Sequence, residues 1–374
     1  MKLREFYKTS FLTSNGRFLL LVLLCTFLVS PFLIKEYVYS EPVDQMSSLN
    51  GMSTKYNDKS EVSLFFNSIK KNQGYLCMGT SESGEIDGYN YFDYLNHDED
   101  LGDKRFSISG GAGRTCSMYI PIFEQHKSEV SGMKIIYLIN PVYWRSDLVK
   151  VSKEYWKRYN SYGNFKDIIH SKKISENRFQ PVLEYVDKLN PFEKFLFSAE
   201  FQLRKFRRSF FHDLRYNFDD KNYLDNFTFI SSAKNGSKNF ESQAKALLGN
   251  VNADYNVFKT FHNFEWFQPI KKDNDYRYRE LIAFIETCKH LNIKAEFILG
   301  PYNKAFVEKY APSEVSNYDE VVLNIKKILE SNNSSYIDAS DISNERGAFS
   351  DHQHHSTYGA YLIYQKIKDH VLEK

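Results

Sequence analysis

The amino-acid sequence predicts an α/β fold, with a mostly parallel sheet covered by helices on both faces. Three observations lead to this prediction. Short apolar runs, of which residues 134–139 are the clearest, have the length and composition of strands buried on both faces. Segments with apolar residues at helical spacing lie between these runs. Several runs end in glycine or proline, and with 374 residues and 42% hydrophobic content the chain can bury a sizeable core.

The individual elements follow from this rhythm. Strands are predicted at 75–79, 105–109, 134–139, 294–299 and 335–338, and helices at 62–70, 279–291, 315–331 and 358–371. Strands that alternate with helices pair in parallel through crossover connections. Residues 145–260 differ, because aromatic and basic residues recur there at helical spacing and no apolar run ends in glycine. We therefore expect one catalytic domain at 62–374 with a helical insertion at about 145–260.

The N-terminal region contains an uncharged apolar run from Phe18 to Ile34, which reaches the lower limit of length for a membrane-spanning helix. Basic residues outnumber acidic ones before the run, and this bias predicts a cytoplasmic N-terminus. We expect residues 1–17 in the cytoplasm, an uncleaved anchor at 18–34 and a polar linker at 35–61. The alternative is a signal peptide cleaved near Val38-Tyr39-Ser40.

Charge and cysteine content narrow the class of protein. A net charge of +2 with no basic block argues against a nucleic-acid partner. The four cysteines form no close pair of the kind that binds a metal, and Cys77 and Cys116 are expected to be small core residues. No cofactor and no metal are expected.

The candidate site combines residues from both ends of the predicted domain. Ser81 follows the strand at 75–79, where the strand passes into a helix or structured loop. A serine nucleophile needs a base, and the base needs an orienting acid. Asp351 precedes His354 by three residues, so its carboxylate can bond Nδ1 and leave Nε2 free for Ser81. The backbone N–H of Gly113 and the side chain of Asn140 follow neighbouring strands and are the candidate oxyanion donors.

Each of these residues also has an ordinary structural interpretation. Ser81 can be a helix N-cap, and Glu82 can be a first-turn acid favoured by the helix dipole. His352 and His355 compete with His354 for the role of base. Three such close histidines also suggest a metal site, although no acidic or cysteine group elsewhere in the sequence completes one.

The order of these motifs resembles the SGNH (GDSL-like) hydrolase superfamily, and most closely its DltD family of D-alanyl transfer proteins. The similarity lies in Gly79-Thr80-Ser81-Glu82, in residues 111–115, and in Asp351, His354 and Gly359 at the family's spacing. Residues 138–144 and 298–304 also resemble family blocks. The sequence departs from the family at His355-Ser356, where Leu-Gly is usual, and at Asn140, which stands near a usual serine.

This resemblance implies a three-layer, flavodoxin-like sheet and a membrane-anchored, extracytoplasmic serine acyltransferase or esterase. By resemblance, the acyl group is D-alanyl and the acceptor is a hydroxyl of teichoic acid or another cell-envelope polymer. The implied partners are the membrane, a membrane-bound O-acyltransferase with its acyl donor, and the polymer itself. Two alternatives remain: an esterase that removes acyl groups from envelope polysaccharide, and a catalytically inactive partner of such a transferase.

Overall fold

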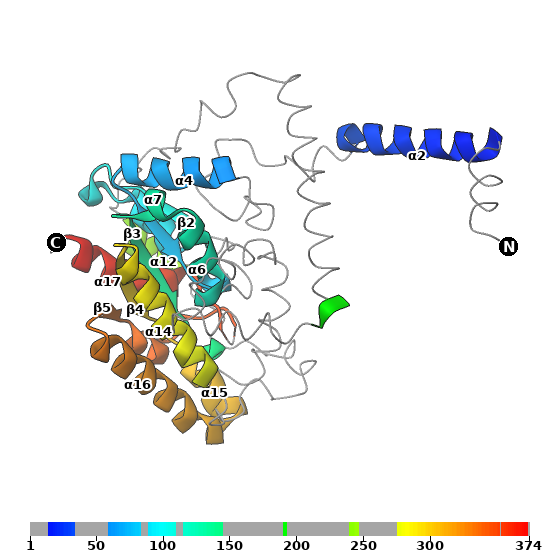
Figure 1. The fold of residues 1–374 in the computed structure, drawn as a ribbon. Coiled ribbons are helices and arrows are strands. Elements are labelled where there is room, and N and C mark those ends of the chain that lie inside the picture. The colour runs from blue at the N-terminus through cyan, green and yellow to red at the C-terminus, as the bar shows by residue number, and fades with distance from the viewer. Residues whose placement is uncertain are drawn as a thin grey trace.

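The computed structural model describes residues 14–33, 59–83, 89–109, 115–144, 190–192, 239–246, 275–351 and 353–372. Five strands form one parallel sheet in the order β2-β1-β3-β4-β5 (Figure 1). They are β1 (Tyr75–Met78), β2 (Phe106–Ser109), β3 (Lys134–Ile139), β4 (Lys294–Leu299) and β5 (Ser335–Asp338). The predicted α/β fold is confirmed, and this strand order is the flavodoxin-like one.

The central strands are apolar on both sides because both faces of the sheet are covered. In β3, Ile135, Tyr137 and Ile139 join one hydrophobic cluster, whereas Ile136 and Leu138 join another. Successive side chains of a strand point to opposite faces, so one continuous apolar run supplies both layers of the core.

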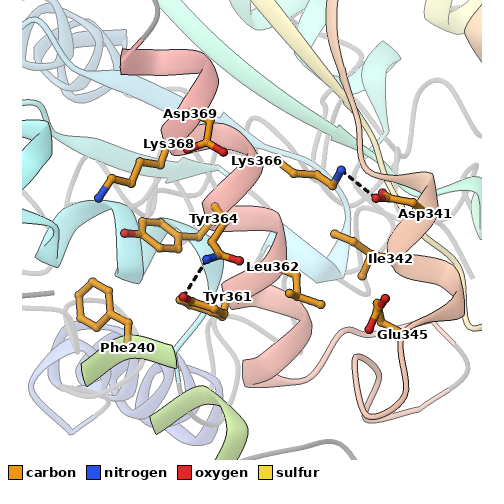
Figure 2. Close-up of a pocket in the computed structure, with 11 residues that line it drawn as sticks. Phe240, Asp341, Ile342, Glu345, Tyr361, Leu362, Tyr364, Lys366, Lys368 and Asp369 are labelled. Carbon is orange, nitrogen blue, oxygen red and sulfur yellow. Dashed lines mark hydrogen bonds and ion pairs between the residues drawn. The ribbon is translucent and has the colours of Figure 1, made fainter. Parts of the chain in front are cut away.

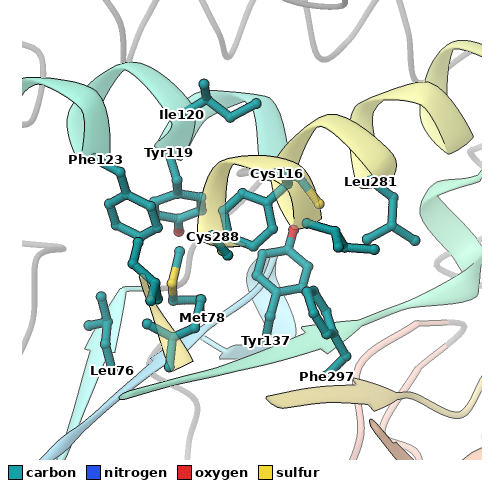
Figure 3. Packing of buried hydrophobic residues seen from close by; sticks show 14 of the residues in the cluster. Leu76, Met78, Cys116, Tyr119, Ile120, Phe123, Tyr137, Leu281, Cys288 and Phe297 are labelled. Atoms are coloured by element: carbon teal, nitrogen blue, oxygen red, sulfur yellow. The ribbon is translucent and has the colours of Figure 1, made fainter. Parts of the chain in front are cut away.

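Helices cover the two faces in separate sets. On one face lie α4 (Lys59–Lys71), α6 (Cys116–Gln125), α7 (Lys127–Val130), α14 (Asp275–His290) and α16 (Val315–Ser331) (Figure 3). On the other lie α5 (Tyr91–His97), α12 (Phe240–Ala246) and α17 (Thr357–Leu372). The four predicted helices are present as α4, α14, α16 and α17. The sequence analysis did not predict α5, α6 or α15 (Lys304–Tyr310).

The cysteines Cys77 and Cys116 are buried, as predicted, one on each face of the sheet. Burial raises the pKa of both thiols, so both are protonated and act as small apolar side chains.

The structure describes only parts of two predicted regions, the N-terminal anchor and the helical insertion. Helix α2 (Ser14–Leu33) contains most of the apolar run, but no helix in the described residues is long and apolar enough to span a membrane. The anchor predicted at 18–34 is therefore not supported. Within the predicted insertion at 145–260, only residues 190–192 and 239–246 are described, and they include α12.

A pocket lies between α17, α12 and the 3₁₀ turn Ser340–Asn344 (Figure 2). Phe240, Tyr361 and Tyr364 contribute aromatic rings to its lining, and Lys366 forms an ion pair with Asp341 at 3.0 Å. None of its lining residues belongs to the candidate site described below.

The carboxyl ends of the central strands approach each other closely because glycine follows two of them. A Cβ on Gly300 would lie 2.6 Å from the carbonyl oxygen of Ile139. A Cβ on Gly79 would lie 2.4 Å from Ser83 Oγ and 3.0 Å from the carbonyl oxygen of Leu138. A side chain at either position would push the strand ends apart, so glycine brings the segments after β1, β3 and β4 together.

Candidate active site

Ser81 begins a 3₁₀ turn, Ser81–Ser83, three residues after β1 ends. Two hydrogen bonds of Ser83 hold the turn in place. Its Oγ donates to the carbonyl oxygen of Met78 at 3.2 Å and contacts the Tyr91 hydroxyl at 3.0 Å. Ser83 is fully buried, whereas Ser81 remains partly exposed. Ser81 thus lies within a short turn at the carboxyl edge of the sheet and does not cap an α-helix.

The loop after β5 presents Asp351 and His354. Asp351 Oδ1 accepts the backbone N–H groups of Gln353 at 2.8 Å and His354 at 2.7 Å. These bonds form a tight Asx-type turn, which explains why the acid and the histidine are three residues apart. The loop is also tied to the end of β4, since Asn303 Nδ2 donates to the Asp351 carbonyl oxygen at 2.7 Å.

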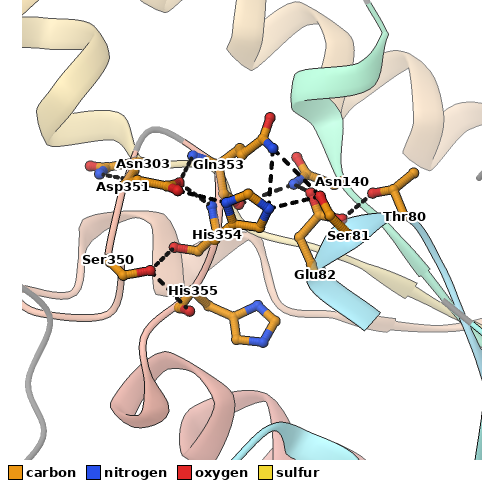
Figure 4. Close-up of polar contacts among 10 residues, drawn as sticks. All are labelled: Thr80, Ser81, Glu82, Asn140, Asn303, Ser350, Asp351, Gln353, His354 and His355. Atoms are coloured by element: carbon orange, nitrogen blue, oxygen red, sulfur yellow. Dashed lines mark hydrogen bonds and ion pairs between the residues drawn. The ribbon is translucent and has the colours of Figure 1, made fainter. Parts of the chain in front are cut away.

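The two segments meet in a continuous relay of hydrogen bonds (Figure 4). His354 Nε2 lies 2.8 Å from Ser81 Oγ, and His354 Nδ1 lies 2.6 Å from Asp351 Oδ2. A neutral imidazole that donates from Nδ1 to the carboxylate keeps the lone pair of Nε2, which accepts the Ser81 hydroxyl. The structure therefore brings together the three residues that the sequence singled out.

The charges of this relay are coupled. Burial by itself lowers the pKa of His354, but the hydrogen bond and charge of Asp351, with a further contribution from Glu82, raise it above its ordinary value. Burial by itself raises the pKa of Asp351, but its bonds to His354 and to the backbone lower it overall. Both net shifts favour an imidazolium next to a carboxylate, which is the state formed when the histidine takes the serine proton.

Asn140 follows β3 and lies beside this relay, but its side chain is fully engaged. Its Nδ2 donates to the Glu82 carboxyl group and, at 3.2 Å, to the Gln353 carbonyl oxygen. Its Oδ1 accepts the backbone N–H of Val142 at 2.9 Å. Both amide hydrogens are thus directed at protein oxygens. The other predicted oxyanion donor, Gly113, lies outside the described residues.

The neighbouring histidines have different positions. His355 is buried, and its Nε2 bonds Asn90 Oδ1 at 2.8 Å. Burial, followed by the nearby charge of His354, lowers the pKa of His355 to about 3, so this ring is neutral, and its hydrogen bond is to Asn90 and not to Ser81. His352 is not among the described residues. Within the residues that are described, no group of three His, Cys, Asp or Glu side chains is placed to hold a metal ion.

Two residues of the site were not identified from the sequence. Glu82, interpreted above as a first-turn acid, is 2% exposed and accepts hydrogen bonds from Thr80 Oγ1 and Asn140 Nδ2. Burial raises its pKa, although the charge of His354 and these hydrogen bonds oppose that effect. Gln353 places its Nε2 3.2 Å from His354 Nε2 and 3.5 Å from Ser81 Oγ. Its position inside the Asp-x-x-His motif was the available signal.

The site lies where the strand order reverses. β1 is flanked by β2 on one side and β3 on the other, so the chain leaves the centre of the sheet in opposite directions. In open α/β sheets ligands bind at such a switch point, outside the carboxyl ends of the strands. Ser81 follows β1 and Asn140 follows β3, so the relay lies at that position.

Comparison with solved structures gives matches of low sequence identity. An acetylxylan esterase from Geobacillus stearothermophilus is 11% identical, with 79% of this chain and 92% of that chain covered and a TM-score of 0.37. A catalytic mutant of the same esterase gives the same identity, coverage and TM-score. Scores this low do not establish a shared fold. No curated protein matches the sequence.

The family comparison covers far more of the molecule than any single motif. The family described as DltD protein matches residues 51–372. This range includes every strand of the sheet and also Ser81, Asp351 and His354. The chain therefore belongs to the DltD protein family.

Proposed function

We propose that this protein is a serine acyltransferase in which Ser81 is the nucleophile, His354 the general base and Asp351 the orienting acid. The observation that supports this proposal most directly is the unbroken relay from Ser81 Oγ to His354 Nε2 at 2.8 Å and from His354 Nδ1 to Asp351 Oδ2 at 2.6 Å. A nucleophile within hydrogen-bond reach of a base, which is itself oriented by a third group, is the arrangement that activates a serine.

The proposed reaction has two half-reactions. In the first, His354 Nε2 takes the proton of Ser81 as Oγ attacks the acyl carbon, and the leaving group receives a proton from His354. In the second, an acceptor hydroxyl gives its proton to His354 and attacks the acyl carbon, and the bond to Ser81 Oγ breaks as Oγ receives the proton from His354. The backbone N–H of Gly113 is the proposed oxyanion donor, on the basis of its sequence position.

Membership of the DltD family supports acyl transfer and narrows the substrates that we propose. The acyl group would be D-alanyl or another small acyl group, and the acceptor a hydroxyl of a cell-envelope polymer such as teichoic acid. The reaction would take place outside the cytoplasm, with a membrane-bound O-acyltransferase as the partner that delivers the acyl group. None of these assignments depends on the apolar run near the N-terminus.

Hydrolysis of the same acyl-enzyme is the second candidate. The side chains of His354 and Asp351 are 28% and 29% exposed, so water can approach the base. Transfer and hydrolysis differ only in which hydroxyl attacks the acyl carbon.

A serine-reactive fluorophosphonate tests the assignment of the nucleophile. The probe should label the full-length protein at Ser81, as mapped by peptide mass spectrometry, and Ser81→Ala should abolish both labelling and turnover of p-nitrophenyl acetate. Ser331→Ala, at the exposed end of α16, is the matched control and should behave as the wild type. Labelling or ester turnover that persists in a folded Ser81→Ala variant would disprove the proposal. A wild-type protein that is never labelled would favour the inactive-partner alternative.

A further inference from the structure

Gln353 is the side chain at this site whose contacts the proposed roles leave unexplained. Its amide nitrogen is within 3.2 Å of His354 Nε2 and 3.5 Å of Ser81 Oγ. In Figure 4 the amide lies next to the imidazole, on the side where the ring meets the serine. Gln353 therefore contacts both atoms that exchange the proton in the proposed reaction.

The other side-chain amide at the site does not offer the same donor. Both hydrogens of Asn140 Nδ2 are directed at Glu82 and at the Gln353 carbonyl oxygen, and its Oδ1 is bonded to Val142. To donate to a substrate, Asn140 would have to leave the buried Glu82 carboxyl group without that hydrogen bond. Gln353 would give up contacts of 3.2 Å to His354 Nε2 and 3.5 Å to Ser81 Oγ, neither of which involves a buried carboxyl group.

The backbone of Gln353 is held by hydrogen bonds on both sides, whereas the oxygen of its side-chain amide is not bonded within the described part of the chain. Its backbone N–H is bound to Asp351 and its carbonyl oxygen to Asn140, at 2.8 Å and 3.2 Å. Its Oε1 is shielded from solvent and has no hydrogen-bond partner among the residues that the structure describes. Turning the amide therefore breaks no bond at Oε1, and the buried oxygen gains if a ligand or water then reaches it.

The position of Gln353 Nε2 indicates which substrate atom this nitrogen can bind. The attacking hydroxyl must lie within hydrogen-bond distance of His354 Nε2, because that nitrogen receives its proton. The Gln353 amide nitrogen occupies this place in the free enzyme, at 3.2 Å from the ring nitrogen. An oxyanion donor would instead be directed at the carbonyl oxygen of the acyl group, which bears the developing charge.

We propose that Gln353 is a further catalytic residue that binds the acceptor hydroxyl in the second half-reaction, an inference that rests on the proposed function. The acceptor oxygen replaces the Gln353 amide at His354 Nε2 and accepts an N–H from Gln353 Nε2. The acceptor proton then passes to His354 Nε2 as the new bond to the acyl carbon forms. The bond between that carbon and Ser81 Oγ breaks, and the proton moves from His354 to Oγ.

The two half-reactions can be measured separately with p-nitrophenyl acetate and glycerol on the full-length protein. The burst of p-nitrophenolate gives the rate of acylation of Ser81, and this good leaving group needs no proton and no acceptor site. The yield of acetylglycerol against acetate, measured over a range of glycerol concentrations, gives the rate constant of transfer. Gln353→Met keeps the length of the side chain and removes the N–H donor. Gln365→Met on α17 is the control, because its amide bonds Tyr361 at 2.8 Å, outside the site.

We expect Gln353→Met to lower the transfer constant by on the order of tenfold, as for loss of one hydrogen bond to the substrate. The acylation burst should fall much less, and Gln365→Met should match the wild type in both. Gln353→Glu, which also lacks an N–H, provides a second variant if Gln353→Met does not fold.

Equal losses in burst and transfer would overturn the inference, because an oxyanion donor acts in both half-reactions. Unchanged transfer in folded variants at position 353 would also overturn it. A wild-type protein that neither turns over p-nitrophenyl acetate nor is labelled at Ser81 by the fluorophosphonate would overturn the proposed function, and this inference with it.

Discussion

Replacement of Asn140 by alanine tests whether this side chain braces the site or serves as an oxyanion donor. The residue is 3% exposed and joins three segments through its hydrogen bonds to Glu82, to the Gln353 carbonyl oxygen and to the Val142 N–H. The substitution leaves three polar groups in a largely buried region without their partner. A buried polar group that loses its hydrogen bond costs about 1–3 kcal/mol, and water entering the new space recovers part of this.

The expected result is a decrease of about 3 kcal/mol in the free energy of unfolding, taking about 1 kcal/mol for each group. Urea denaturation followed by tryptophan fluorescence measures it. Asn96→Ala is the matched control, since Asn96 makes two hydrogen bonds to the backbone of Phe106, at 2.8 and 2.9 Å, in a partly buried place away from Ser81. That variant should lose less stability and keep normal fluorophosphonate labelling.

The labelling rate of Ser81, measured on folded Asn140→Ala, separates the two roles. If Asn140 holds the site together, the variant should have a much lower free energy of unfolding and a moderately lower labelling rate. The reasoning would be refuted by an unchanged free energy of unfolding together with labelling slower by about 10²–10³-fold, which is the effect of removing an oxyanion donor.

Three further predictions concern the histidines and their acid. Asp351→Asn should reduce kcat for p-nitrophenyl acetate by on the order of 10⁴-fold, because the imidazole loses the acceptor that fixes its tautomer; a loss below tenfold would exclude Asp351 as the orienting acid. The acid limb of kcat/KM should have its midpoint above 6.5, because His354 must be neutral to act as a base and its pKa is raised; a midpoint below that value would contradict the dominance of Asp351. The contribution of His355 to stability should be lost as the pH falls below 6.5, since the unfolded chain protonates His355 there and the folded chain does so only at about 3, whereas the raised pKa of His354 acts in the opposite direction. The loss amounts to about 2 kcal/mol at pH 5, and His355→Gln, whose amide can still donate to Asn90, should abolish it in urea titrations; an equal pH dependence in both proteins would contradict this.

Much of the sheet was predictable because its signals are local. The strand at 134–139 is an unbroken apolar run, and the structure gives β3 the same bounds. The bounds of β4 and of α16 also equal the predicted ranges. In α16 the signal is the recurrence of apolar residues at helical spacing. Helices α5 and α15 are only seven residues long, which is too short for periodicity to distinguish a helix from a turn.

The relay of Ser81, His354 and Asp351 could be proposed because a known chemistry requires those three residue types. The role of Glu82 had no such template, since an acid after a strand is usual at the start of a helix. Only the meeting of β1 with β3 encloses its carboxyl group between Thr80 and Asn140. Similarly, the Asp-x-x-His spacing favours His354 as the base, but only the fold shows that His355 is buried and bonded to Asn90.

The separation of Ser81 and His354 by 273 positions has a consequence for the biogenesis of the protein. Ser81 is synthesised early, whereas His354, its proposed base, follows only in the loop between β5 and α17. Until β5 and α17 have docked, Ser81 has an unperturbed hydroxyl and no reactivity towards esters. A chain that is truncated, or interrupted during synthesis, would therefore be chemically silent. Covalent labelling of Ser81 in cells would thus count only those molecules that have finished folding.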